Sequence, residues 1–478
     1  MMRYCLLTVI GFFSFVFGFT QTPYVYLFGN LHAHSSYSDG NKSDTTKHPI
    51  DDYIFAREAN CMDFLGISEH NHATAGLQIA KYHLGLAQAD NINGVVSSSG
   101  KSIVTLWGME WGVISNGGHV IVYGFDNQLI GWEPGNYDIF CAEYDYVSLW
   151  NLINAHSGAF ATLAHPQQND YTNLANGAYN HLADSAIYGV AVESGPAFST
   201  STSYNDFPSS LSYLPVYQQL LAKGYHLGAQ MDQDTHYMTF GESNTNRMVV
   251  LATDKTRAAL VEAIRSMRFY ASEDCNVRVD YKCGASVMGS SVTANGVASL
   301  SLNVTDPDAG ETVASIALWG GQVGSSIPIA PLKTYTSGAT TVSFSASDAE
   351  NVQPNNTTYY YYAVITQGDG NKIVTSPIWY NRNDIVTAVS SVPEASASFN
   401  VYPNPSRGVT YLHSTNISGP VSIEVKDISG RVAFKLDKVI YPHSTIPIPL
   451  EGLARGTYFV NLATKANTQV IRIIVDND

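Results

Sequence analysis

Short apolar segments in the first half of this chain lead, one after another, into histidine or carboxylate side chains. Residues 24–31, 64–67, 102–109 and 160–164 are apolar stretches of strand length, and each reaches such a group within two residues. Buried imidazole and carboxylate groups are costly unless they are paired or bind a metal ion. This order therefore constrains both the fold and the chemistry. The polar groups are His32-Ala33-His34 with Asp39, Glu69-His70-Asn71-His72, Glu110, His119, Ala164-His165-Pro166 and Asp234-Thr235-His236.

Helical segments alternate with these apolar segments. Pro49 precedes a helix expected over residues 50–59, and further helices are expected over residues 146–155, 213–223 and 256–267. In a parallel βα barrel the groups that follow the strands gather at one face, where the active sites of such barrels lie. The alternation predicts a parallel βα barrel with its site at that face.

The residue types at the strand ends indicate metal chemistry. Imidazole and carboxylate hold Zn, Mn or Fe while leaving positions open for water and substrate. Each motif alone has an ordinary alternative, such as a capped turn or a hydrogen-bonded core histidine. Nine candidate groups in order exceed what one ion needs, so we expect a multinuclear hydrolytic centre.

Charge excludes one class of partner. The net charge is -15 and the pI is about 5.3, whereas nucleic-acid backbones are neutralised by Lys and Arg. No Lys or Arg occurs from Ser102 to Ala222. A nucleic acid polymer is not expected as a partner, and a phosphate group would be held chiefly by metal ions.

The N-terminus predicts export. Arg3 precedes an apolar run over residues 5–19, which is typical of a secretory signal peptide over residues 1–20. The run is shorter than the roughly 18–20 apolar residues that a membrane span needs. No second run of this kind appears, so we expect no transmembrane segment.

Four cysteines remain after the signal peptide, and they allow up to two disulfides with three connectivities. Cys275 and Cys283 flank an expected hairpin and are the preferred pair. Cys61 lies between a helix and an apolar strand, where a buried free thiol is expected. Cys141 shows no metal-binding spacing with the others.

The second half of the chain is strand-rich. Residues 273–380 carry alternating segments separated by Gly, Asp, Asn and Pro turns, which predicts a β-sandwich. Residues 381–399 have the composition of a linker. Residues 400–478 form another small strand-rich unit.

The first of these parts, residues 21–272, resembles the PHP (polymerase and histidinol phosphatase) superfamily, and within it the CehA/McbA-like secreted group. The motifs are H-x-H…SDG at residues 32–40, I-S-E-H-N at residues 67–71, A-H-P at residues 164–166 and D-x-H at residues 234–236. The resemblance implies a distorted (β/α)7 barrel with two or three divalent ions (Zn, Mn or Fe). The ligands it implies are His32, His34, Asp39, His70, Glu110, His119, His165, Asp234 and His236.

Several roles follow from that resemblance. Asp39, Glu110 and His165 are expected to take part in catalysis, with Glu110 bridging metal ions. Glu69 departs from the family's usual Asp, at a position that is not itself a ligand, which leaves its hydrogen bonding open. The residues expected to contact substrate, with an outer supporting role as the alternative, are His72, Gln167 and Glu193.

The C-terminal unit resembles the type A sorting domain of the type IX secretion system. Its three segments, residues 401–408 (VYPNPSRG), 425–432 and 453–460, occur in order. The resemblance implies contact with that secretion machinery. It also implies a secreted or cell-surface location on a Gram-negative bacterium, reached through the periplasm.

These features together predict a secreted metal-dependent hydrolase. The expected activity is that of a phosphoesterase on a small molecule, with metal-activated water as nucleophile. One alternative keeps the metal centre and hydrolyses a carbamate, ester or amide. A second alternative is a non-catalytic surface protein that binds metal or glycan.

Overall fold

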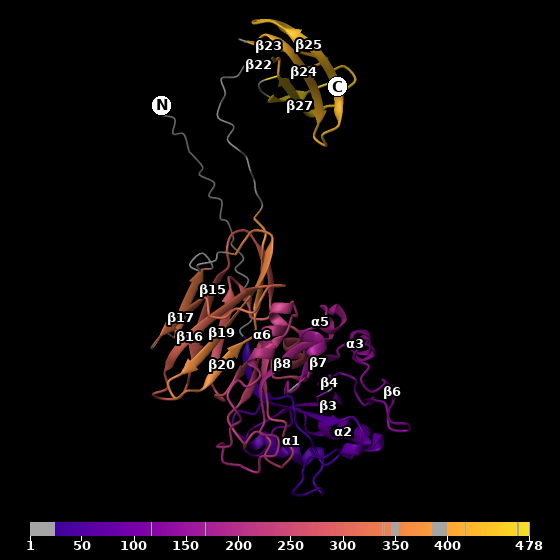
Figure 1. Ribbon diagram of the computed structural model, residues 1–478, viewed down its shortest axis with the longest axis vertical. Helices are drawn as coiled ribbons and strands as arrows, with labels where there is room; N and C mark the ends of the chain where they lie inside the picture. Colours follow the sequence, from indigo (N-terminus) through magenta and orange to yellow (C-terminus); the bar gives the residue numbers. More distant parts are fainter. Residues whose placement is uncertain are drawn as a thin grey trace, which may run out of the picture. The chain divides into compact units, whose positions relative to one another are not determined.

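The computed structural model describes residues 24–384, apart from 116, 168, 337, 339 and 346–352, and residues 399–477, apart from 416, 466 and 467. The chain divides into two compact units, Met1–Ile385 and Val386–Asp478 (Figure 1). The predicted signal peptide and most of the predicted linker lie outside the described residues.

A large mixed sheet forms the framework of the first unit. Its path runs β10-β1-β2-β3-β4-β7-β8-β9 and continues from β10 through β11 into the second half of the unit. These strands are β1 (Val25–Asn30), β2 (Phe64–His70), β3 (Val104–Val113), β4 (Gly118–Tyr123), β7 (Phe160–Leu163), β8 (Ile187–Ser194), β9 (Gly228–Asp232), β10 (Arg247–Ala252) and β11 (Phe269–Ser272), and β5 (Ile130–Gly131) and β6 (Ile139–Phe140) form a separate pair.

The strand directions differ from the all-parallel pattern that we predicted. β1, β2 and β3 are parallel, and so are β7, β8 and β9. Between these two groups, β4 is antiparallel to both β3 and β7, and β10 is antiparallel to β1. A (β/α)7 barrel is therefore not confirmed, although β9 packs beside β10 and β11.

Helices cover this sheet. Helix α3 has the predicted bounds, and α1, α6 and α7 lie within two residues of theirs. The helices are α1 (Pro49–Glu58), α2 (Ile79–Ile92), α3 (Tyr146–Ala155), α4 (Thr172–Ala175), α5 (His181–Ala186), α6 (Leu214–Lys223) and α7 (Arg257–Arg265), with the short 3-10 turn η1 (Ala73–Ala75). Among the described residues, none of the helices has the length and apolar character of a membrane span.

Helix α2 was not predicted. Its buried residues Tyr82, Gly85, Ala89 and Ile92 have helical spacing, but a glycine inside a helix normally weakens it. A Cβ atom at Gly85 would lie 2.0 Å from the Trp107 ring. The glycine thus serves close packing between α2 and β3.

The second half of the first unit contains two sheets, as expected for a β-sandwich. One is a separate sheet with the order β13-β12-β15-β18. The other is part of the large sheet and contains the strands β14-β21-β19-β20 together with β16 and β17. The strands are β12 (Arg278–Cys283), β13 (Ser286–Val287), β14 (Ser291–Ala294), β15 (Ser299–Thr305), β16 (Val313–Gln322), β17 (Lys333–Thr336), β18 (Thr341–Ser345), β19 (Thr357–Gln367), β20 (Lys372–Thr375) and β21 (Ile378–Arg382).

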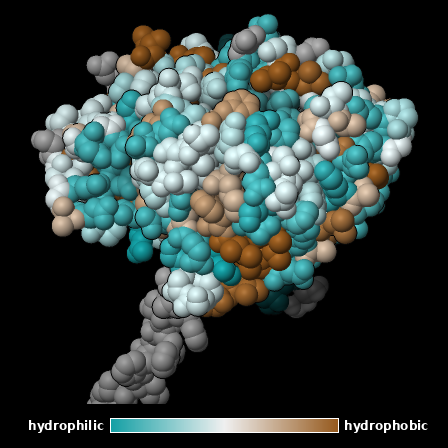
Figure 2. Space-filling model, turned by 90° about the horizontal axis from the view of Figure 1, so that it is seen from below, coloured by the Kyte–Doolittle hydropathy of each residue, from teal (hydrophilic) through white to brown (hydrophobic). Residues whose placement is uncertain are grey.

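The sandwich is continuous with the first part of the unit. β11 pairs antiparallel with β20, so the hydrogen-bonded ladder crosses the boundary predicted at residue 272. In Figure 1, α3 and α5 lie on the opposite side of the unit from β15, β16 and β17. The face seen in Figure 2 is mainly hydrophilic, with apolar patches separated by polar side chains.

The preferred disulfide was wrong. Cys61 is bonded to Cys275 across 214 residues of sequence, while Cys141 and Cys283 are buried free cysteines. The expected hairpin lies after Cys283, where β12 turns into β13. Because β12 runs extended between Cys275 and Cys283, these two cysteines cannot meet.

The C-terminal unit consists of two antiparallel sheets, β22-β23-β26 and β25-β24-β27-β28. Buried aliphatic side chains, including Ile423, Val460 and Ile473, form its core. The strands are β22 (Phe399–Tyr402), β23 (Val409–Ser414), β24 (Gly419–Asp427), β25 (Val432–Ile440), β26 (Thr445–Pro449), β27 (Gly456–Thr464) and β28 (Thr468–Val475).

Candidate metal centre

The histidine pair of the first motif lies directly after β1. His32 and His34 are two residues apart, so in extended chain they project on the same side, while Ala33 is buried on the other. Ala33 pairs with Thr235, and the His34 amide donates to the Thr235 carbonyl at 2.9 Å. The H-x-H and D-x-H segments therefore run side by side.

Strand register brings the next residues to the same place. His70, the last residue of β2, is aligned with Glu110 of β3 in the parallel ladder. His119 of β4 is aligned with Gly112 of β3 in the antiparallel ladder. His165 follows the end of β7, which pairs with β4.

Glu110 lies at the centre of five histidines and is 1% exposed. Each carboxylate oxygen faces a different set of rings. Oε1 is 2.7 Å from His119 Nδ1, 3.0 Å from His165 Nε2 and 3.1 Å from His32 Nε2, and Oε2 is 3.2 Å from both His34 Nε2 and His70 Nε2. This geometry suits a carboxylate shared between ions.

Two aspartates complete the cluster. Asp234 Oδ1 lies 3.1 Å from Nε2 of both His32 and His34. Asp39 contacts His70 at 3.0 Å and His236 at 3.4 Å. The Asp39 side chain is 30% exposed, so it borders solvent.

All nine residues predicted as ligands are thus brought together. Their donor atoms form three overlapping groups, each with atoms within 4.8 Å of one another. The groups are His34, Asp39, His70 and His236; His32, His34, Glu110 and Asp234; and His70, Glu110 and His119. His165 joins them through its contact with Glu110.

The donor geometry fits divalent metal ions. His32 Nε2 and His34 Nε2 lie 3.3 Å apart, and both face Asp234 Oδ1. Two nitrogens bound to one tetrahedral zinc ion would lie about 3.3 Å apart. Among the described residues, Glu110 Oε2 and His119 Nδ1 are buried and make no well-oriented hydrogen bond, although both lie close to other atoms of the cluster. An ion would satisfy these atoms.

The electrostatics keep the central carboxylates ionised. Burial opposes the charge of Glu110, but His119, His32 and His70 hold its pKa well below the usual value. Burial also opposes the charge of Asp234, and again the surrounding histidines lower the pKa. Ionised carboxylates are the form that binds metal.

Glu69 supports the loop that carries Asp39. It is fully buried and accepts hydrogen bonds from the backbone N–H and hydroxyl of Ser35 and from the hydroxyl of Ser38. Burial raises its pKa to about 7, and the two serines act in the opposite direction. The longer side chain thus finds its partners in the serines of the first motif.

Tyr171 ties two site segments together. Its hydroxyl contacts the carbonyl of His119 and, at 2.9 Å, that of Ala164. Gly118 makes room for it, because a Cβ atom there would lie 2.4 Å from the Tyr171 ring and φ is +95°. In the sequence, only the position of Gly118 beside His119 hinted at this role.

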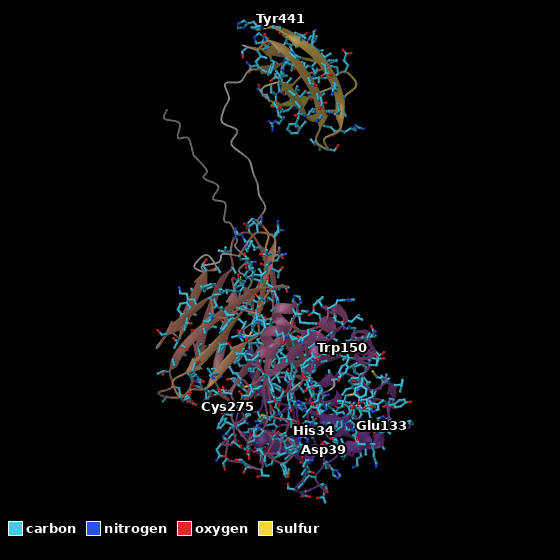
Figure 3. The ribbon with its side chains drawn as sticks, in the orientation of Figure 1. His34, Asp39, Glu133, Trp150, Cys275 and Tyr441 are labelled. Atoms are coloured by element: carbon cyan, nitrogen blue, oxygen red, sulfur yellow. A yellow bond between two sulfur atoms is a disulfide. The ribbon has the colours of Figure 1, made fainter. Side chains whose placement is uncertain are left out.

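A pocket of about 530 Å³ opens beside the cluster. His70 and His119 form its inner wall, and Trp132, Glu133 and Glu143 line it further out. Figure 3 labels Glu133, His34 and Asp39 within the same region of the first unit. Sequence analysis missed these outer residues, since they come from connections without a motif.

Lys42 lies at the rim of the cluster. Lys42 Nζ is 3.2 Å from Asp39 Oδ2 and 5.5 Å from the centre of the Phe198 ring. Phe198 is 63% exposed, and its ring lies 4.8 Å from that of His236. Lys42 lies outside the stretch without basic residues, and only its position three residues after Asp39 hinted at a role.

The three predicted substrate contacts have different surroundings. His72 lines the pocket beside His70. Gln167 lies two residues after His165, and its backbone N–H donates a hydrogen bond to the Asp170 carboxylate at 3.1 Å. Glu193 is 1% exposed and accepts from the Leu211 amide and the Asn246 side chain. These partners favour the alternative expected for Glu193, an outer supporting role.

The C-terminal unit is a secretion system C-terminal sorting domain, since residues 400–476 match that family. The match confirms the sorting domain that the sequence predicted. It indicates a protein that is secreted, or displayed at the cell surface, through the type IX machinery. No curated protein matches the chain in sequence.

Solved structures show distant likeness. One is a two-domain protein from Bacteroides vulgatus that contains a predicted PHP-like metal-dependent phosphoesterase. It is 15% identical, covers 75% of this chain and 97% of its own, and has a TM-score of 0.36. The fibronectin(III)-like modules of Clostridium thermocellum CbhA are 13% identical over 41% of this chain and 94% of their own, with a TM-score of 0.15. These TM-scores are low, so function is argued below from the site alone.

Proposed function

We propose that this protein is a secreted metal-dependent hydrolase that acts on small phosphoesters. The observation that carries the proposal is the convergence of six His and two Asp side chains with Glu110. A closed structural zinc site needs only four ligands. Eight residues in three overlapping groups, with His165 beside them, instead suit two or three ions with positions left for water and substrate.

The residues of the cluster have different roles in this proposal. His32, His34 and Asp234 would hold one ion with Glu110, while Asp39, His70 and His236 would hold a second. When bound, such ions polarise a phosphoryl or carbonyl oxygen and lower the pKa of water. Glu110 faces both groups of residues and would contact both ions, and His165 orients Glu110 through its contact at 3.0 Å.

Lys42 supplies the positive charge that an anionic substrate requires at the open edge. Its ammonium group lies beside Asp39, the more exposed of the two cluster aspartates. Phe198 offers an exposed ring on the same edge, against which an apolar part of the substrate could pack. The pocket volume suits a small molecule.

One observation favours a second candidate, hydrolysis of a carbamate, ester or amide. Glu133 and Glu143 place two carboxylates on the pocket wall, and the described residues that line the pocket include no Lys or Arg. Carboxylates repel a phosphate but tolerate a neutral or cationic substrate. A carbonyl compound would therefore meet less repulsion on this side.

The test compares an aryl phosphate with an aryl ester of the same leaving group, using the metal-loaded protein. We expect faster turnover of the phosphate, and we expect Lys42→Met to raise its KM about three- to tenfold while changing kcat little. Glu133→Gln is the control at the other wall. Turnover of the ester alone, unaffected by Lys42→Met, would contradict the phosphoesterase proposal and support the second candidate.

The route of export completes the proposal. The predicted signal peptide would carry the chain into the periplasm of a Gram-negative bacterium, and the sorting domain would direct it across the outer membrane. Hydrolysis would then take place outside the cell or at its surface.

A further inference from the structure

A second group of oxygen ligands lies far along the chain from the metal centre. Asp274 follows β11, Asp306 follows β15, Glu311 precedes β16, and Gln367 ends β19. The three carboxylates each offer an oxygen within 4.8 Å of the others. Two segments of the first unit, at residue 274 and at residues 306–311, therefore bring negative charge to one point.

The Gln367 amide is held at the middle of this group. Its Nε2 lies 2.6 Å from Asp306, 3.0 Å from Asp274 and 3.3 Å from Glu311. An amide nitrogen has two hydrogens, so it can satisfy at most two of these three carboxylates. The group carries more negative charge than the amide can accommodate.

The oxygen at the other end of the same amide is the second observation in favour of a bound ligand. Gln367 is 2% exposed, and its Oε1 is buried without a hydrogen-bond partner among the described residues. The two ends of a glutamine amide have the same shape, and their assignment depends on the surrounding network. Rotation of the amide by 180° would place Oε1 among the three carboxylates as a fourth oxygen.

The charges have no protein counter-ion. Among the described residues, no Lys or Arg forms an ion pair with Asp274, Asp306 or Glu311 within 4.0 Å. Burial, followed by the nearby Asp306, raises the pKa of Glu311 to about 7. Burial likewise raises the pKa of Asp274. Carboxylates crowded in this way are stabilised by a proton or by a cation.

We propose that Asp274, Asp306, Glu311 and the side-chain oxygen of Gln367 form a Ca²⁺ site. All four ligands are oxygens, which suits a hard cation and not the ions that prefer imidazole or thiolate. The flexible coordination of Ca²⁺ tolerates ligands from three separate segments, whereas Mg²⁺ demands near-ideal octahedral geometry. Export places the protein where Ca²⁺ sites of modest affinity are common.

Such an ion would connect the two halves of the first unit. Asp274 belongs to the segment that leaves the first part of the sheet, and the other three ligands belong to the sandwich. Cys275, the next residue, is bonded to Cys61. The disulfide would therefore attach the segment at residues 274–275 to Cys61, and the cation would attach the same segment to the sandwich.

The test is titration of the purified full chain with CaCl2, after the transition-metal centre has been filled. We expect one Ca²⁺ per chain with a Kd of about 0.1–1 mM, and a Tm higher by about 2–5 °C in 10 mM Ca²⁺. Asp306→Asn and Glu311→Gln should each weaken binding at least tenfold. Asp308→Asn makes the same charge change in the same loop and should bind as the parent chain does.

A second measurement distinguishes a lost site from a damaged fold. Without Ca²⁺ at pH 8, Asp306→Asn should unfold at a higher temperature than the parent chain, because one crowded charge is gone. Added Ca²⁺ should then raise the Tm of the parent chain clearly more than that of Asp306→Asn. No binding at 10 mM Ca²⁺, equal binding by Asp306→Asn, or equally tight binding of Mg²⁺ would each overturn the assignment.

Discussion

Glu110 is the residue on which the geometry of the centre depends most. Five imidazole rings face its two oxygens, and their positive potential overcomes burial to keep it charged. The ring of His165 reaches Glu110 but no other carboxylate within 4.0 Å among the described residues. Its contribution can therefore be removed without disturbing the Asp39 and Asp234 contacts.

We expect His165→Ala to lower kcat at least about 100-fold, because a misplaced Glu110 would hold its ions poorly. The free energy of unfolding should fall by no more than about 1–3 kcal/mol, since the side chain is not part of the apolar core. Steady-state kinetics and urea unfolding measure the two effects. Glu193→Gln is the control and should retain most activity. Retained activity in His165→Ala would remove this residue from the site.

Glu193 allows a pH prediction. Burial, and then the neighbouring Glu273, raise its pKa to about 8, so the folded state binds a proton that the unfolded state releases above about pH 4.3. The contribution of Glu193 to stability should therefore be largest below that pH and be lost as the pH rises toward 8, by up to about 5 kcal/mol. Urea unfolding at pH 5, 6.5 and 8 measures this, and Glu193→Gln should show a flatter profile. An identical slope in both proteins would contradict the assignment.

At the scale of elements, the position of a strand end explains which site residues could be foreseen. His70, His165 and Asp234 lie where apolar runs end, so pattern and motif together located them. The antiparallel strand β4 was not foreseen, because alternation of strands and helices says nothing about strand direction. Lys42, Phe198 and Trp132 lie in connections, where chain folding alone decides what approaches the site.

Tyr171, in the connection between β7 and β8, is the subject of the next prediction. Tyr171→Phe removes the hydroxyl that contacts the carbonyls of His119 and Ala164. Because both carbonyls are buried, we expect a loss of about 1–3 kcal/mol in the free energy of unfolding, together with a several-fold fall in kcat. Thermal unfolding and kinetics check this. Unchanged kcat with reduced stability would limit Tyr171 to a structural role.

At the scale of the whole molecule, the strand-rich C-terminal unit was predicted from its motifs and confirmed by its family match. The Cys61–Cys275 disulfide was not predictable, because it depends on how residues 214 positions apart meet in the fold. For the same reason, continuity of the sheet through β11 and β20 could not be read from local patterns.

The two compact units predict independent behaviour. A chain ending at Asp384 should keep the same metal content and kcat as the full chain, because no described ligand candidate of the centre lies in the second unit. It should also fail to leave the periplasm. Metal analysis, kinetics and cell fractionation test these points. Lost catalysis with normal metal content would mean that the second unit contributes more than sorting.

The most direct test of the account is the metal content of the purified chain, measured by mass spectrometry before and after chelation, together with activity. We predict at least two transition-metal ions per chain, loss of hydrolysis on chelation, and recovery when Zn²⁺ or Mn²⁺ is restored. His34→Ala, which removes a donor shared by two of the three groups, should bind at least one ion fewer. A single tightly held ion in the parent chain, with hydrolysis indifferent to chelation, would contradict the multinuclear centre.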